Sequence, residues 1–194
     1  MPVWLGVDVG GPRKGFDAAL VDEKALLVLR GGLDRDAVLG LIDDARPALV
    51  AVDGPRACAP AGERSRACER ELVRAGVCGI RFTPDRTQVH AGAAGYYGWV
   101  VEGLRLYEGL VARGVDAIEV FPTASWTRWH GPRGARRRSA WSIEALSRLG
   151  LAGVPPRTNQ DQRDAIAAAV TAREHAHRRT EAFGAAIVVP RAPG

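Results

Sequence analysis

Two aspartates, Asp8 and Asp53, each stand at the end of an apolar run that is typical of a buried strand. Their surroundings are VWLGVDVGGP and LVAVDGP, so a turn-forming Gly or Pro follows each carboxylate almost at once. A carboxylate at the C-terminal end of a buried parallel strand lies where open α/β sheets bind their ligands. On neighbouring strands the two side chains would be about 5 Å apart, and charges that close repel each other unless a cation lies between them. The alternative is that each aspartate only caps a local turn.

A second pair, Asp161 and Asp164, begins a strongly helical stretch, NQDQRDAIAAAVTAREH. Residues three apart lie on the same face of a helix, and the many alanines that follow would let this helix lie close against a sheet. The alternative is that acids in a first turn only complement the helix dipole, a role that would suffice for Asp161.

Carboxylates gathered in this way bind hard cations through oxygen, which predicts Mg²⁺ or Mn²⁺ as the cofactor and not zinc. Two such ions about 4 Å apart would activate a water and stabilise the leaving oxygen in phosphodiester hydrolysis. We therefore expect a catalytic, metal-binding site made of Asp8, Asp53, Asp161 and Asp164, with Asp8 bridging both ions.

The elements that must position these aspartates are predicted from the hydrophobic periodicity of the chain. Apolar runs predict strands at residues 3–9, 15–21, 25–30, 48–52 and 115–121, with an optional last strand at 185–189. Helical periodicity predicts helices at residues 35–46, 63–75, 93–113, 142–149 and 160–178. An opening meander followed by α/β crossovers predicts the α/β class, as a mixed five-stranded sheet in the order 3-2-1-4-5 with helices on both faces. This order is similar to that of the ribonuclease H-like fold. We expect one such domain over residues 1–194, with a helical and irregular insertion around 56–114.

The composition is that of a folded domain, because 46% of the 194 residues are hydrophobic and 25% are charged. No apolar run of about 18 residues exists, which excludes a membrane span, and no basic region precedes the first apolar run, so we expect a cytoplasmic protein. The three cysteines, Cys58, Cys68 and Cys78, match neither a disulfide scaffold nor a zinc pattern. The net charge of +5 permits a nucleic-acid partner without demanding one.

Five short stretches carry a resemblance to a known family. They are GVDVGG at 6–11, AVDGPRA at 51–57, RACEREL at 66–72, EVFPTASW at 119–126 and DQRDAIAAAVTA at 161–172. Their order and spacing resemble domain of unknown function 429, a family described as predicted nucleases with a ribonuclease H-like fold. More distantly, D-x-x-D-A-x-A-x-A resembles the last catalytic helix of bacterial Holliday-junction resolvases, where an aspartate on strand one and an acid ending strand four complete the site. Two features depart from the family pattern, namely Glu69 in place of Asp and the basic loop at 133–138.

Several other residues have two interpretations. Glu119 interrupts a buried strand, so it is either an additional acid of the site or the partner of an arginine such as Arg56 or Arg66. Trp126, Trp129 and Trp141 flank the basic loop and either stack on a nucleic acid strand or pack in the core. The basic residues that could contact a phosphate are Lys14, Arg56, Arg66, Arg136, Arg137 and Arg138.

Together these features favour a divalent-metal-dependent nuclease acting on DNA or RNA. Two other functions stay open. A non-enzymatic nucleic-acid or nucleotide-binding module could keep the fold and its acids. GVDVGG also resembles the first phosphate loop of actin-like and sugar-kinase-like ATPases, although those enzymes need two such domains around a nucleotide cleft. The sequence decides neither between DNA and RNA nor the oligomeric state.

Overall fold

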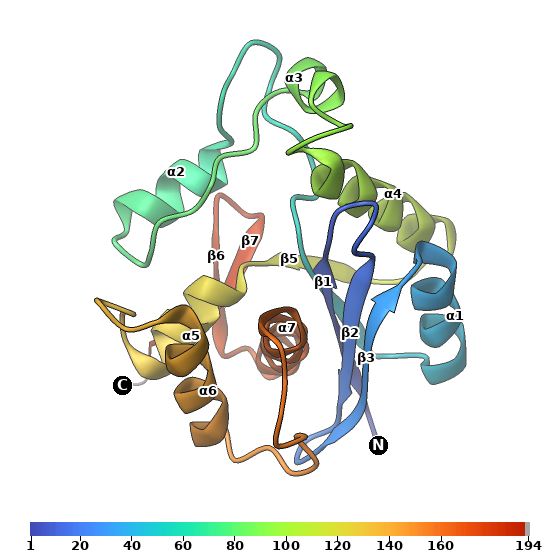
Figure 1. Cartoon of the computed structure of the whole chain (residues 1–194), viewed down its shortest axis with the longest axis vertical. Helices are drawn as coiled ribbons and strands as arrows, with labels where there is room; N and C mark the ends of the chain where they lie inside the picture. Colours follow the sequence, from blue (N-terminus) through green and yellow to red (C-terminus); the bar gives the residue numbers. More distant parts are fainter. Residues whose placement is uncertain (193–194) are drawn as a thin grey trace.

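The computed structural model describes residues 1–192, in which one sheet carries helices on both faces (Figure 1). Within these residues seven strands form the sheet, in the order β3-β2-β1-β4-β5-β7-β6. The strands are β1 (Trp4–Val9), β2 (Phe16–Val21), β3 (Leu26–Leu33), β4 (Leu49–Asp53), β5 (Ala117–Val120), β6 (Thr180–Phe183) and β7 (Ile187–Pro190). The helices are α1 (Arg35–Ala45), α2 (Ala67–Arg74), α3 (Arg86–Ala91), α4 (Gly98–Ala112), α5 (Pro122–His130), α6 (Arg138–Arg148) and α7 (Gln160–Ala176).

The first five strands have the predicted order 3-2-1-4-5, with β1, β4 and β5 parallel and β2 and β3 antiparallel. The predicted number of five strands is wrong, because β7 pairs with β5 and β6 then pairs with β7. Helix α7 ends at Ala176, earlier than predicted, and the chain after it turns back into β6. The optional strand expected at 185–189 is present as β7.

Two helices lie where none was predicted. Pro122 follows the strand predicted at 115–121 and occupies the first turn of α5, where a missing N–H costs nothing. Helix α3 falls in a stretch that was expected to be irregular, and Asp85 caps its N-terminus through a hydrogen bond from the Gln88 amide. None of the helices in the described residues is long and apolar enough to cross a membrane.

The pleat of the sheet divides its side chains between two cores. Alternate residues of a strand point to opposite faces. On β1, Trp4 packs in the core beneath α7, whereas Leu5 and Val7 pack in the core beneath α1 and α4. Gly6 and Asp8 therefore lie on the same face as Trp4, which is the α7 face.

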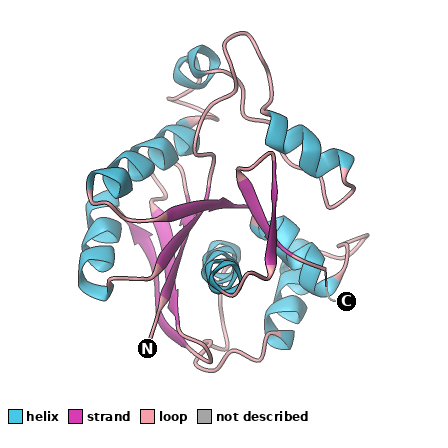
Figure 2. Ribbon diagram, turned by 180° about the vertical axis from the view of Figure 1, so that it is seen from behind, coloured by secondary structure: helices cyan, strands magenta, loops and turns pink. Residues whose placement is uncertain are grey.

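Helix α7 lies in the concave side of the sheet and contacts all seven of its strands within the described residues (Figure 2). Such close contact needs small side chains on both surfaces. The helix provides buried alanines, and β1 provides Gly6, where a Cβ atom would lie 2.1 Å from the Ala165 carbonyl oxygen and 2.1 Å from the Ala169 nitrogen. The backbones of β1 and α7 are therefore in direct contact, two residues before Asp8.

This contact predicts that Gly6→Ala destabilises the protein, because the methyl group would force α7 away from the sheet. We expect the free energy of unfolding to fall by about 2 kcal/mol or more, measured by urea denaturation. Gly40→Ala in α1 is the matched control, since a Cβ atom there meets nothing within 4 Å. It should stabilise the helix by roughly 0.5–1 kcal/mol. Equal effects of the two changes would contradict the tight contact.

Candidate functional site

Three aspartates lie side by side on adjacent strands. Asp8 on β1 is in register with Asp53 on β4 and with Asp17 on β2. Register partners point to the same face of a sheet, so all three carboxylates lie on the α7 face. The strand-end pattern that singled out Asp8 and Asp53 thus brings these two residues together.

Helix α7 adds its two aspartates from above the sheet. Asn159 caps the helix and forms a capping box with Gln162, which fixes its first turn over the strand ends. Asp161 is half-buried and pairs with Lys14, whose Nζ lies 2.6 Å from the Asp161 Oδ2 atom.

Asp164 is buried, and four hydrogen bonds hold its carboxylate. Trp126 Nε1 donates one at 2.9 Å, Arg138 Nη2 donates one at 2.8 Å, and Gln160 Nε2 donates to both oxygens at 3.0 and 3.1 Å.

Asp17 is a member of this cluster that sequence reasoning missed. One oxygen each of Asp8, Asp17 and Asp161 lie within 4.8 Å of one another, a spacing that a single cation can bridge. Asp17 is only 5% exposed, and its Oδ1 atom has no hydrogen-bond partner among the described residues. Buried polar atoms are rarely left unpaired. The signal that could have found Asp17 is an aspartate inside an apolar strand, GFDAALV, that follows the strand of Asp8 along the chain.

The negative charge of the acidic cluster is only partly compensated by neighbouring basic groups, and the pKa values of most of its aspartates are raised. Burial, followed by the charges of Asp53, Asp164 and Asp161, holds the pKa of Asp8 well above its usual value. Burial and the charge of Asp164 raise the pKa of Asp53 to about 8. The pKa values of Asp17 and Asp164 are also raised by burial, although Lys14 opposes the change at Asp17 and Arg138 opposes it at Asp164.

These shifts predict that Asp53→Asn stabilises the metal-free protein at neutral pH. An aspartate whose pKa is raised by folding makes the folded state less stable as pH climbs from about 4 to about 8, because only the unfolded chain ionises freely. Asparagine removes this cost. We expect a gain of more than about 1 kcal/mol at pH 8, measured by thermal unfolding in a chelator.

The same gain should vanish near pH 4, where the carboxyl group is protonated in both states. A variant that is less stable than the wild type at every pH would show that Asp53 is already compensated by its neighbours.

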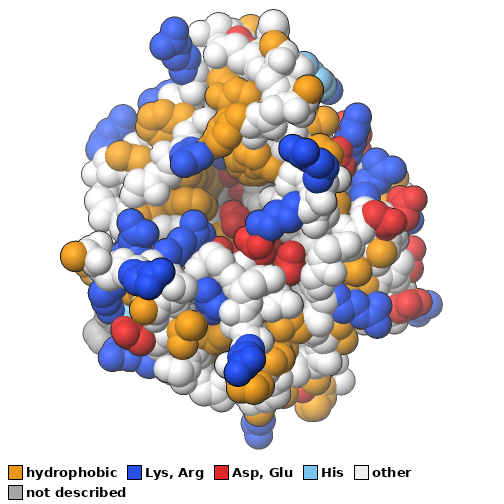
Figure 3. Space-filling view, viewed as in Figure 1, with side chains coloured by type: hydrophobic (Ala, Val, Ile, Leu, Met, Phe, Trp, Pro, Cys, Tyr) orange, Lys and Arg blue, Asp and Glu red, His pale blue; other side chains and the backbone are white. Residues whose placement is uncertain are grey.

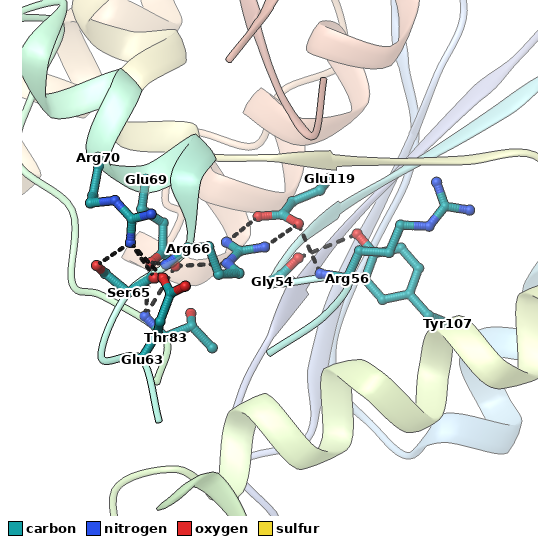
Figure 4. Close-up of polar contacts among 10 residues, drawn as sticks. All are labelled: Gly54, Arg56, Glu63, Ser65, Arg66, Glu69, Arg70, Thr83, Tyr107 and Glu119. Carbon is teal, nitrogen blue, oxygen red and sulfur yellow. Dashed lines mark hydrogen bonds and ion pairs between the residues drawn. The ribbon is translucent and has the colours of Figure 1, made fainter. Parts of the chain in front are cut away.

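Glu119 lies apart from the aspartates. On β5 it is in register with Val52, one residue out of phase with Asp53, so it points to the opposite face of the sheet. There the guanidinium of Arg66 donates two hydrogen bonds to its carboxylate, at 2.8 and 2.6 Å, and the Arg56 amide donates a third at 2.8 Å (Figure 4). Both arginines named as possible partners therefore bind Glu119, one of them through its backbone.

The Arg66–Glu119 pair belongs to a larger buried network (Figure 4). Arg66 Nε also donates to Glu69 at 2.9 Å, and Glu69 in turn accepts hydrogen bonds from the amides of Arg66 and Thr83. Glu69 is fully buried. The network ties α2 and the segment after it to β5. Glu69 stands where the family resemblance implies Asp, and its carboxylate contacts both the start of α2 and the segment after it.

We predict that Glu119→Gln lowers the free energy of unfolding by about 3 kcal/mol or more, because it leaves the Arg66 guanidinium buried with one fewer countercharge. Mn²⁺ affinity, measured by calorimetry, should stay unchanged. Glu102→Gln is the control, since Glu102 pairs with the more exposed Arg105 on the same helix and the change should cost less than about 1 kcal/mol. A loss of Mn²⁺ affinity in Glu119→Gln would instead make Glu119 an acid of the site.

The basic residues predicted to contact phosphate are distributed over four places, one of which is the buried network where Arg66 binds Glu119. Lys14 and Arg138 lie against the acidic cluster, with side chains 57% and 47% exposed. The Arg56 guanidinium lies over the Tyr107 ring and donates to the Ala117 carbonyl oxygen. Arg136 is held by the Pro132 carbonyl oxygen at an exposed position, and Arg137 is the exposed residue that precedes α6.

Of the tryptophans near the basic loop, two are core residues. Trp126 is fully buried and donates to Asp164, and Trp141 is 1% exposed and donates to the Gly131 carbonyl oxygen. Trp129 is half-buried and packs edge-on against Trp126. Trp126 is thus a positioning residue for an acid of the cluster, which the sequence did not indicate.

No protein-family model matches the sequence, and no curated protein matches it. Solved structures do match the fold. RuvC from Thermus thermophilus in complex with a Holliday junction substrate has a TM-score of 0.54 and 16% identity, and the match covers 96% of this chain and 98% of that one. A second Thermus thermophilus RuvC structure has a TM-score of 0.52 and 17% identity, covering 91% of this chain and 96% of that one. The chain has a ribonuclease H-like fold.

A cavity of about 760 Å³ lies beside the acidic cluster, where strands β4 and β5 end, and it opens on the face of the molecule that Figure 3 shows. Figure 3 shows this face hollowed, with acidic side chains in the hollow, hydrophobic side chains around it and basic side chains at its margin. Asp53 and Arg138 line the cavity, and so do Arg66 and Glu119 of the buried network. The cavity therefore joins the acidic cluster to the segment after α2.

Proposed function

We propose that this protein is a divalent-metal-dependent nuclease that hydrolyses phosphodiester bonds at the acidic cluster. The observation that carries the proposal is the convergence of Asp8, Asp17, Asp53, Asp161 and Asp164 from three adjacent strands and helix α7 of a ribonuclease H-like fold. The match to RuvC, one structure of which holds a Holliday junction substrate, supports a nucleic acid as the partner.

The donor set fits Mg²⁺ or Mn²⁺. All the candidate ligands are carboxylate oxygens, which these hard cations prefer. The raised pKa values of Asp8 and Asp53 mark negative charge that the protein leaves uncompensated, and the unpaired Asp17 Oδ1 marks a buried acceptor without a donor among the described residues. When bound, such a cation supplies polarisation of a water and charge stabilisation at the phosphate.

The protein's own residues would divide the remaining work. The aspartates hold the cations and fix their place relative to the strand ends. Trp126 and Gln160 each donate a hydrogen bond to the Asp164 carboxylate, and these bonds hold its side chain in one orientation toward a bound cation. Lys14 and Arg138 are exposed cations beside the cluster, placed to bind phosphate oxygens and hold the strand against it.

We also propose that the chain belongs to domain of unknown function 429 and that it is located in the cytoplasm. Membership of domain of unknown function 429 is supported by the five sequence stretches and by the fold they imply. A cytoplasmic location accords with a nucleic-acid substrate.

We predict that Asp8→Asn lowers Mn²⁺- or Mg²⁺-dependent cleavage of labelled DNA or RNA by at least about 100-fold, because even residues that only support metal ligands cost 10- to 100-fold when changed. Asp43→Asn is the matched control. Asp43 lies on α1 in a surface ion pair with Arg113, so cleavage should be unchanged. The substrates should include single strands, paired duplexes and four-way junctions.

Intact substrate under every metal would overturn the nuclease. Nucleic-acid binding that is indifferent to both chelator and Asp8→Asn would instead identify a binding module with the same fold.

A further inference from the structure

The cavity beside the acidic cluster is larger than cation binding requires. Its volume of about 760 Å³ falls in the range of pockets that enclose a small organic ligand, roughly 300–1,000 Å³. Most of it lies away from Asp8, Asp161 and Asp164, none of which lines it. Binding of cations by the acids therefore does not account for a cavity of this size.

Its walls are apolar on the side away from the aspartates. Val77 and Ile80 come from the segment after α2, Trp99 from α4 and Phe121 from the end of β5. Trp99 and Phe121 are half-buried, so part of each aromatic ring remains available to a ligand. Flat aromatic and aliphatic surfaces of this kind suit a nucleobase, whichever base it is.

The polar groups of the cavity lie at its floor and its mouth. At the floor the Arg66–Glu119 pair and Glu69 are held by their mutual hydrogen bonds, so this part is formed before a ligand arrives. At the mouth Arg81 and Arg133 are exposed, and neither is in an ion pair among the described residues. A positively charged mouth around an apolar interior matches a nucleotide, whose phosphate stays outside while its base enters.

We propose that this cavity binds one unpaired nucleotide of the nucleic acid substrate, with the base against the apolar wall that carries Ile80 and Phe121, its own phosphate at the Arg81 and Arg133 mouth, and the neighbouring phosphate near Arg138 and Asp53. The proposal rests on the nuclease function above and names the kind of substrate that the site accepts. A base inside a duplex is stacked and paired, and extracting it costs free energy. A bulge, a mismatch or a junction supplies such a base without that cost.

The test compares two short DNA duplexes that differ by a single unpaired nucleotide, together with their RNA counterparts. Dissociation constants are measured by fluorescence anisotropy with Ca²⁺ replacing Mg²⁺, so that binding is read separately from cleavage. We expect the wild-type protein to bind the bulged duplex about tenfold more tightly than the paired one, as one stacked base would provide.

Gly79→Phe should abolish this preference. Gly79 lines the cavity, a Cβ atom there meets nothing within 4 Å, and its backbone is not in the left-handed region, so the ring can enter the cavity without strain. Thr123→Phe fills the same space from α5 and should act alike. Gly40→Phe, at an equally open glycine on α1, is the control and should keep the preference.

The outcomes separate this proposal from the nuclease itself. Equal binding of both duplexes by the wild-type protein, or a preference that survives both cavity-filling variants, would overturn the nucleotide site alone. A preference lost in Gly79→Phe and Thr123→Phe, without cleavage under any metal, would support the site and overturn the nuclease. Failure to bind any of the probes would overturn both.

Discussion

The close contact between helix α7 and strand β1 is the constraint on which the candidate site depends. At Gly6 the two backbones touch, and the alanines of α7 keep the helix at that distance along the sheet. Two residues further along β1, the same contact brings Asp8 beneath Asp161 and Asp164. A larger side chain at the contact would stabilise neither element, and it would separate the carboxylates that the helix and the sheet contribute.

Bringing these carboxylates together has an electrostatic cost, which the protein offsets only in part. Lys14 and Arg138 each neutralise one acid of α7, and Trp126 satisfies a buried oxygen of Asp164. Asp8 and Asp53 have no such basic partner among the described residues, and their pKa values rise accordingly. The uncompensated charge is greatest where β1 and β4 end, which is where a bound cation would lower the free energy most.

The sequence predicts those parts of the site that local patterns encode. An apolar run with an Asp at its end and a Gly or Pro within two residues identifies Asp8 and Asp53, and helical spacing pairs Asp161 with Asp164. The order of the first five strands is likewise predicted from the succession of elements along the chain. The features that sequence could not provide depend on register. Whether Asp17 faces Asp8 across the hairpin, and whether Glu119 shares a face with Asp53, are set by single-residue alignments between strands that no local pattern records.

The cavity and the acidic cluster share an edge because the C-terminal ends of the parallel strands contribute to both. The end of β4 provides Asp53, and the end of β5 leads through Phe121 into α5. The buried network of Arg66, Glu69 and Glu119 then holds the segment after α2 above this edge, closing one wall. The cavity therefore lies directly beside the aspartates, so under the proposal above a nucleotide held in it would place the neighbouring phosphate at the acidic cluster.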